Sequence, residues 1–140
     1  MAAKDIYHEA CVRALEKDGW TITHDPLRLP IEDTTLLVDI GAERIVTAER
    51  GTERIAVEVK SFVSLSAVQD LRDAVGQFWL YELALRKLPE HQDRTLYLAL
   101  RKAMFERVFV KGIGKLFLED KSLPLIVFDP ESEEITQWIK

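Results

Sequence analysis

The order of the short apolar runs constrains the fold of this 140-residue chain most. Several runs are alternating or continuously apolar over only a few residues, as β-strands are, and two segments have the period of amphipathic helices. A helix, four strands, a long helix, a strand, short helical pieces and two strands follow one another. This order predicts an α/β fold with a central mixed β-sheet flanked by helices. No repeat, low-complexity tract or Gly/Ser linker interrupts it, so we expect a single domain over residues 1–140.

The first half of the chain predicts a helix followed by an antiparallel meander. Gly19 ends a helix over 5–18, and Asp25-Pro26 begins a loop that runs past Pro30. Short turns at Gly41 and Gly51 separate the later strands. The expected strands are 20–24, 35–40, 44–49 and 53–62, and the expected apolar side of the helix holds Ile6, Ala10, Cys11, Ala14 and Leu15.

The second half of the chain begins with a long helix. Ser66-x-x-Gln69 is a capping box, and an apolar stripe follows it toward Leu85. We expect this stripe to contain Val68, Leu71, Val75, Phe78 and Trp79, and the three tryptophans, Trp20, Trp79 and Trp138, to anchor the core. Further expected elements are a buried strand over 95–100, helical pieces over 103–110 and 115–121, and strands over 123–128 and 134–139.

Charged residues interrupt two of the apolar strands. Asp39 lies within the first and Glu58 and Lys60 within the second, where alternation places Glu58 and Lys60 on one face. Burying such charges is costly without partners. If the meander pairs, Asp39 lies near Glu58, and a hard cation relieves the repulsion between two carboxylates. The pattern therefore predicts a Mg²⁺ site at Asp39 and Glu58, with Mn²⁺ as a substitute, and with Lys60 orienting water or stabilising charge on an attacked phosphodiester.

The setting of this motif matters more than the motif itself. An acid-x-Lys triplet occurs twice, at Glu58-x-Lys60 and Glu119-x-Lys121, about as often as composition alone predicts. Only the first lies in an apolar strand that follows another strand with an acid. The alternative is a structural ion pair of Lys60 with Glu58 or Asp39 at a sheet edge.

Three more residues are candidates for the same site. Gln77 and Tyr81 share a helix face at an i, i+4 spacing and are placed to contact a phosphate or a metal-bound water. Glu9 on the first helix is a candidate third carboxylate. The alternatives are an ordinary amphipathic border for Gln77 and Tyr81 and a solvated position for Glu9. His8, His24 and His91 lack the spacing of metal ligands.

Asp39, then Glu58-x-Lys60, then Gln77-x-x-x-Tyr81 on the following helix resembles the pattern of the PD-(D/E)xK nuclease superfamily, in its exonuclease and resolvase-like branches. The sequence departs from the name-giving motif at Val38, where the superfamily has proline. The resemblance implies a restriction-endonuclease-like fold and a Mg²⁺-dependent endonuclease site at Asp39, Glu58 and Lys60.

Over almost its whole length the chain resembles the XisH family. The resemblance rests on Asp5-Ile6-Tyr7-His8-Glu9, on stretches 18–29, 38–44 and 56–62, and on Val127-Phe128-Asp129-Pro130. The family is known as fdxN element excision controlling factors of cyanobacteria. The resemblance implies a role beside an XisI-like partner in letting a site-specific recombinase excise a DNA element during heterocyst differentiation. An active endonuclease and a non-catalytic protein-binding module that regulates a recombinase through its partner are the competing hypotheses.

The charge of the chain is unevenly distributed. Residues 86–115 hold eight Lys/Arg and three acids, a local +5, so the net −5 leaves −10 on the remainder. If its basic residues share a face, the segment predicts weak or partner-assisted DNA binding; the alternative is a set of solvated charges. The candidate nucleic-acid-binding residues are Arg86, Arg94, Arg101, Lys102, Arg107 and Lys111.

The remaining composition narrows the setting. One cysteine, Cys11, excludes an internal disulfide and suits a reducing compartment. No apolar run approaches the roughly 20 residues of a membrane span, and no signal-peptide segment begins the chain. We therefore expect a cytoplasmic protein without a membrane partner. The oligomeric state stays open, with a homo-oligomer among the alternatives.

Overall fold

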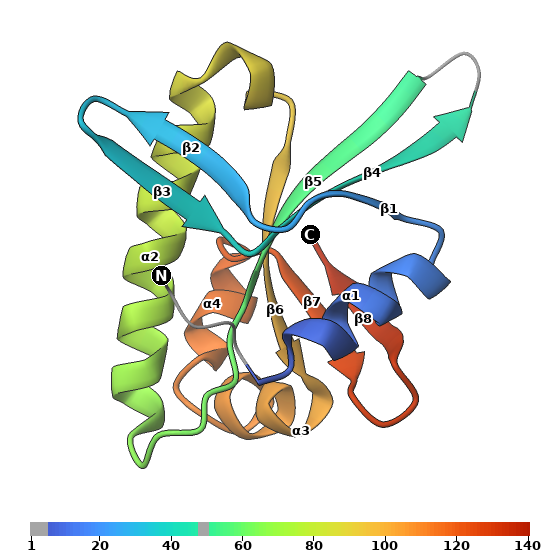
Figure 1. The fold of residues 1–140 in the computed structure, drawn as a ribbon. Coiled ribbons are helices and arrows are strands. Elements are labelled where there is room, and N and C mark those ends of the chain that lie inside the picture. Colours follow the sequence, from blue (N-terminus) through green and yellow to red (C-terminus); the bar gives the residue numbers. More distant parts are fainter. Residues whose placement is uncertain (1–5, 48–50) are drawn as a thin grey trace.

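A six-stranded mixed β-sheet forms the centre of the computed structural model, which describes residues 6–47 and 51–140 (Figure 1). The strand order is β1-β4-β5-β6-β7-β8; β5, β6 and β7 are parallel to one another, and the outer pairs are antiparallel. This arrangement confirms the predicted α/β class. The strands are β1 (Thr21–His24), β4 (Ile40–Thr47), β5 (Gly51–Val59), β6 (Thr95–Arg101), β7 (Leu125–Asp129) and β8 (Glu134–Ile139).

Helices cover both faces of this sheet, and each face has its own apolar core. The long helix α2 (Ala67–Lys87) packs on one face, and α1 (His8–Lys17) packs on the other (Figure 1). Along β5, Ala56 faces the α2 side, whereas Ile55 and Val57 face the α1 side. The shorter helical segments are η1 (Pro89–His91), α3 (Lys102–Met104), the π-helical η2 (Phe105–Val110) and α4 (Lys115–Asp120).

Helix α1 follows the predicted apolar pattern. Cys11, Ala14 and Leu15 are fully buried against the sheet, and Gly19 leaves the helix with a left-handed φ of 92°. That conformation is one that glycine adopts without steric cost. Ile6 was expected on the same apolar face, but it precedes the helix and is 74% exposed. Asp5, the predicted first residue, lies outside the described residues.

Helix α2 begins at the predicted cap, and part of the predicted apolar stripe faces the core. The Ser66 hydroxyl accepts a hydrogen bond from the backbone N–H of Gln69 at 3.1 Å. Phe78 is buried, as predicted, whereas Val68 is 40% and Trp79 60% exposed. The prediction for Val68 and Trp79 was therefore wrong. The buried face consists of Leu71, Phe78 and Leu85 from the predicted stripe together with Ala74, Tyr81 and Ala84.

The predicted loop past Pro30 is in fact a β-hairpin. Strands β2 (Leu27–Ile31) and β3 (Thr34–Val38) pair antiparallel in a sheet of their own, and Glu32 in the turn has a φ of 54°. Pro30 predicts a loop, but a two-stranded sheet consists only of edge strands, which tolerate a missing N–H. The hairpin lies over α2 (Figure 1) and buries Leu27 and Leu29 in the α2-side core.

The predicted strand 35–40 is divided between two sheets. Strand β3 ends at Val38, and β4 begins at Ile40, so Asp39 lies at the junction. Gly41 was expected in a turn, but it pairs with Ala56 inside β4. The antiparallel pairing of β4 with β5 is confirmed. Glu49, the predicted end of the next strand, lies outside the described residues.

The C-terminal half follows the predictions closely. Strand β6 lies between β5 and β7, and Leu96, Leu98 and Leu100 are each at most 1% exposed. Helical pieces and two strands follow in the predicted order. A Cβ at Gly112 would approach the carbonyl oxygens of Arg107 and Val108 to 2.6 Å, so the break between η2 and α4 needs a residue without a side chain.

No helix within residues 6–47 and 51–140 combines the length and apolar character needed to cross a membrane.

Candidate active site

The register of β4 and β5 brings Asp39 opposite Glu58. Ile40 pairs with Val57, so one step toward the junction places Asp39 beside Glu58. Each carboxylate accepts a backbone hydrogen bond from the other segment. The N–H of Asp39 donates to Glu58 Oε1 at 3.2 Å, and the N–H of Val59 donates to Asp39 Oδ2 at 2.8 Å. At the junction of β3 and β4, side-chain carboxylates thus take the place of backbone carbonyls as hydrogen-bond acceptors.

Burial makes this acid pair electrostatically unfavourable when both groups are charged. Glu58 is only 5% exposed, and burial, followed by the charge of Asp39, raises its pKa to about 8. Burial also raises the pKa of Asp39, against the opposing effects of the Val59 hydrogen bond and of the charges of His8 and Lys60. At neutral pH and without a cation, the two carboxyl groups therefore retain a proton between them.

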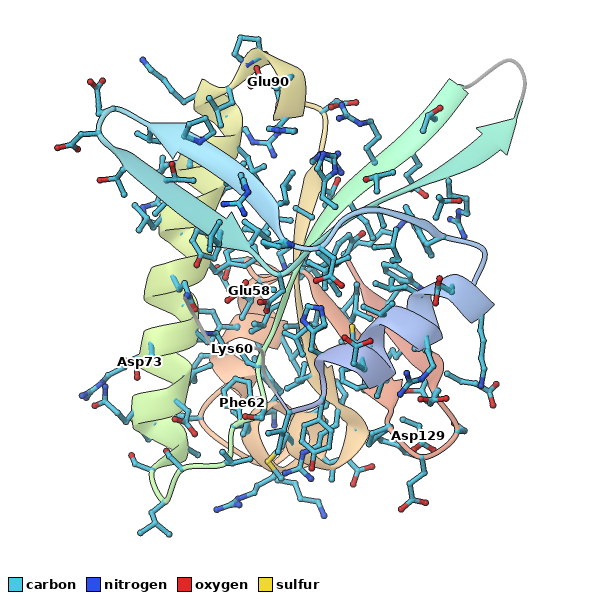
Figure 2. The ribbon with its side chains drawn as sticks, in the orientation of Figure 1. Glu58, Lys60, Phe62, Asp73, Glu90 and Asp129 are labelled. Carbon is cyan, nitrogen blue, oxygen red and sulfur yellow. The ribbon has the colours of Figure 1, made fainter. Side chains whose placement is uncertain are left out.

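Lys60 forms an ion pair with Glu58. Its Nζ lies 3.5 Å from Glu58 Oε2, and its side chain is 29% exposed. Figure 2 shows Glu58 and Lys60 near the middle of the molecule, where the chain leaves β5. The predicted placement of Glu58 and Lys60 on one face is confirmed. This ammonium offsets one charge of the pair and can reach solvent.

A cavity of about 250 Å³ adjoins Lys60 at the end of β5. Phe62 forms part of its wall and has a φ of 52°, which is uncommon for a bulky side chain. The polar groups of the wall come from Lys60, Ser61, Ser64, Asp70 and Asp73. The serines and aspartates form no recognisable motif in the sequence. They come together only because the turn after β5 lies against the start of α2.

Gln77 and Tyr81 lie on α2 close to the acid pair. The Gln77 Nε2 amide donates a hydrogen bond to the Tyr81 hydroxyl at 2.8 Å, which confirms that they share a helix face. Burial, followed by the charge of Glu58, raises the pKa of Tyr81 to about 12. Tyr81 is thus a neutral hydroxyl within electrostatic reach of Glu58, at the boundary between the core and the site.

Glu9, the third candidate carboxylate, lies on the exposed side of α1. Its carboxylate belongs to a cluster with His8 and Asp25 in which the ligand atoms all lie within 4.8 Å of one another. Its proposed contribution to the Asp39–Glu58 pair stays a prediction. The cluster was missed in the sequence because His8 and Asp25 are 17 positions apart.

The donor set of the acid pair suits a hard divalent cation. Asp39 and Glu58 provide four carboxylate oxygens, each with more than one acceptor site, and the described backbone hydrogen bonds occupy only two of these oxygens. Mg²⁺ binds through one or two carboxylates and keeps several waters, so it needs no closed cage. The residues therefore fit the cation that the sequence implies.

The six predicted DNA-binding residues do not share one face. Arg94 is 1% exposed, and it donates hydrogen bonds to the carbonyl of Ile55 at 2.7 Å and to that of Ala42 at 3.4 Å. Its prediction as a phosphate contact was wrong, because the structure uses its charge inside the fold. The Arg86 guanidinium contacts the Glu82 carboxylate and the carbonyls of Gln92 and Arg94.

The other four basic residues lie at or beyond the opposite end of β6, roughly 20 Å from Arg94 for a strand of this length. The Arg101 guanidinium lies over the Tyr7 ring at 4.9 Å from its centroid. Lys102 and Lys111 line one cavity of about 510 Å³, and Arg107 is exposed on η2. Only these four of the six predicted residues therefore remain candidates for contacts with DNA phosphates.

A family model described as XisH protein matches residues 1–136. This chain belongs to the XisH family. The match confirms the resemblance seen in the sequence, and it includes α1, the acid pair and α2. A crystal structure of an XisH family protein from Nostoc punctiforme PCC 73102 is 39% identical, with a TM-score of 0.83 over 97% of this chain and 100% of that chain.

A second XisH relative carries a functional description. The crystal structure of an fdxN element excision controlling factor protein from Anabaena variabilis is 40% identical, with a TM-score of 0.83 over 98% of this chain and 100% of that one. The XisH family thus includes excision controlling factors, and the fold described above is shared with solved members. No match was found among curated proteins.

Proposed function

We propose that this chain controls the excision of a DNA element and that its acid pair is an endonuclease-like metal site acting on DNA phosphodiesters. The supporting observation is the pairing of half-buried Asp39 with buried Glu58, with Lys60 at 3.5 Å from Glu58. Two like charges in a buried site destabilise the fold unless a cation or a proton neutralises them. The order of Asp39 and Glu58-x-Lys60 also resembles the PD-(D/E)xK nuclease pattern, with Val38 in the place of its proline.

Asp39 and Glu58 would hold Mg²⁺, with Mn²⁺ as a substitute. When bound, such a cation polarises a phosphoryl oxygen and lowers the pKa of a bound water. The Lys60 ammonium is placed to stabilise negative charge on the attacked phosphate and to orient the attacking water. The Gln77–Tyr81 hydrogen bond orients the tyrosine hydroxyl, which lies within electrostatic reach of Glu58.

DNA binding by the isolated chain is expected to be weak. Two of the six predicted basic residues serve the fold, which leaves Arg101, Lys102, Arg107 and Lys111 for phosphate contacts. A partner, XisI-like by the family resemblance, would supply further surface, and a site-specific recombinase would be the regulated enzyme. The salt dependence of DNA binding measures this directly, because each phosphate contact contributes about one unit to the slope.

A second candidate function, a protein-binding module that regulates a recombinase through its partner, is favoured by the outer face of α2. Trp79 is 60%, Leu80 51% and Leu83 53% exposed, and a Cβ at Gly76 would meet no atom within 4 Å. Clustered exposed apolar side chains are typical of protein interaction sites. The Trp79→Ser and Leu83→Ser variants are expected to lose binding of a partner protein while retaining their fold.

A cleavage assay tests the catalytic part of the proposal. Supercoiled and linear DNA are incubated with the chain and MgCl₂, and the Lys60→Ala variant is compared with Lys140→Ala, which removes an exposed lysine at the C-terminus. We expect Lys60→Ala to lose about a thousandfold in cleavage rate, since it removes the group that stabilises charge on the phosphate. If the unaltered chain cuts no form of DNA, alone or with its partner, the endonuclease proposal fails and the regulatory module is favoured.

A further inference from the structure

We propose that His8, Glu9 and Asp25 form a second divalent-cation site, chemically distinct from the Asp39–Glu58 pair. His8 and Glu9 lie in the first turn of α1, and Asp25 directly follows β1. One nitrogen and two carboxylates therefore converge from two segments of the chain, with their ligand atoms all within 4.8 Å of one another. This proposal does not depend on nuclease activity.

The imidazole of His8 is held in a direction that suits a ligand. The side chain is 2% exposed, and its Nε2 lies 2.7 Å from Asp25 Oδ1. Its Nδ1 is buried without a hydrogen-bond partner among the described residues. The ring is thus fixed through the atom that points into the cluster.

The spacing of the cluster is close to that of a coordination shell. Ligand atoms bound at about 2.0–2.1 Å in a tetrahedral arrangement lie about 3.4 Å apart. The present separation of 2.7 Å between His8 Nε2 and Asp25 Oδ1 is that of a shared proton. A cation that replaces this proton would need this pair to separate by well under 1 Å. Glu9 lies on the exposed side of α1.

The donor set selects the kind of cation. Imidazole nitrogen is a ligand for Zn²⁺ and other first-row transition cations, whereas Mg²⁺ prefers oxygen alone. Two carboxylates neutralise a divalent charge, so the bound cluster would add no net charge to the N-terminus of α1. Among the described residues no side chain caps that terminus, and the cation would join it to the turn after β1.

The charge of His8 lowers the pKa of Asp39, which indicates that the two sites are neighbours. Their donor chemistry nevertheless separates them. A variant without the acid pair, Asp39→Asn/Glu58→Gln, isolates the cluster, and Glu9→Gln and Asp25→Asn each remove one carboxylate of it. Glu16→Gln, which changes an exposed acid on the same helix, is the matched control.

The experiment titrates chelator-treated full-length chain with MnCl₂ or ZnCl₂ by calorimetry. We expect the Asp39→Asn/Glu58→Gln variant to bind one cation. Glu9→Gln and Asp25→Asn should each weaken that binding by about tenfold or more, and Glu16→Gln should leave it unchanged. Single Glu9→Gln and Glu16→Gln variants of the otherwise unaltered chain repeat the comparison. They provide the test if the Asp39→Asn/Glu58→Gln variant does not fold.

The proposal is overturned if binding disappears with the acid pair, or if Glu9→Gln and Glu16→Gln bind equally well. Either result would leave His8–Asp25 as a structural hydrogen bond. Neither result bears on the cleavage assay, in which Lys60→Ala reports on the acid pair alone, so failure here and failure of the nuclease proposal can be told apart.

Discussion

Two buried charged sites in this fold differ in how their charges are satisfied. At the start of β6, the Arg94 guanidinium bonds to the carbonyls of Ala42 and Ile55 and to His91 Nδ1, the last at 3.2 Å. At the junction of β3 and β4, the carboxylates of Asp39 and Glu58 face each other. Arg94 has acceptors on several sides, whereas the acid pair has a like charge as its neighbour.

The difference separates a structural charge from a functional one. A buried cation surrounded by acceptors stabilises the arrangement that surrounds it. A buried like-charged pair destabilises the fold unless something outside the chain neutralises it, and such arrangements concentrate at functional sites. The comparison predicts opposite responses to substitution: removing Arg94 should destabilise the protein, and neutralising Glu58 should stabilise it.

The largest effect on stability is expected for Arg94→Met. This variant leaves the carbonyls of Ala42 and Ile55 without their donor, and the free energy of unfolding should fall by about 3–5 kcal/mol. Urea unfolding measures the loss, and Arg72→Met, at an exposed position of α2, is the control. Equal stability of the two variants would show that the hydrogen bonds of Arg94 do not stabilise the fold.

A smaller effect of opposite sign is expected for Glu58→Gln. Because the folded-state pKa of Glu58 is raised to about 8, folding favours the protonated form. Its contribution to stability is present below about pH 4.5, the ordinary value, and is lost as the pH rises through about 8. The variant lacks this loss, so at pH 9 it should be more stable than the unaltered chain by an amount on the order of 2–4 kcal/mol.

Thermal unfolding between pH 5 and pH 9 without divalent cations measures this effect of Glu58→Gln. The matched control is Glu119→Gln, in the second acid-x-Lys triplet of the chain, which is exposed on α4. Parallel pH profiles for Glu58→Gln and the unaltered chain would refute the buried, proton-retaining pair.

The smallest effect is expected for Tyr81→Phe. The variant removes the acceptor of the Gln77 amide at the edge of the site, which should cost about 1 kcal/mol of unfolding free energy. Since the pKa of Tyr81 is raised to about 12, this cost should be constant from pH 5 to pH 9. A loss of cleavage as large as that of Lys60→Ala would instead make the hydroxyl a catalytic group.

The acid pair could be predicted from the sequence because two local signals agree. Charges inside apolar strand segments are rare enough to notice, and the turn signal at Gly51 predicts that the strand before it pairs with the strand that contains Glu58. The prediction held although Asp39 lies between two sheets and not within a strand, since the pairing of Ile40 with Val57 still fixes its neighbour.

Other features depend on tertiary contacts that no local pattern records. Pro30 marks a loop in most contexts, and only the small separate sheet makes it a strand residue. Arg94 belongs to a basic segment, but its burial follows from the pairing of strands far away in the chain. Trp79 has the sequence spacing of a core residue, but in the folded protein its side chain is 60% exposed.

The most direct measurement is calorimetric titration of the chain with Mg²⁺ at pH 7 in two buffers that differ in their enthalpy of ionisation. A cation that binds to Asp39 and Glu58 must displace the proton they retain, so we expect release of about one proton for each Mg²⁺ bound and loss of binding in Glu58→Gln. Mg²⁺ binding without proton release, or equal binding by Glu58→Gln, would contradict a cation site at the acid pair.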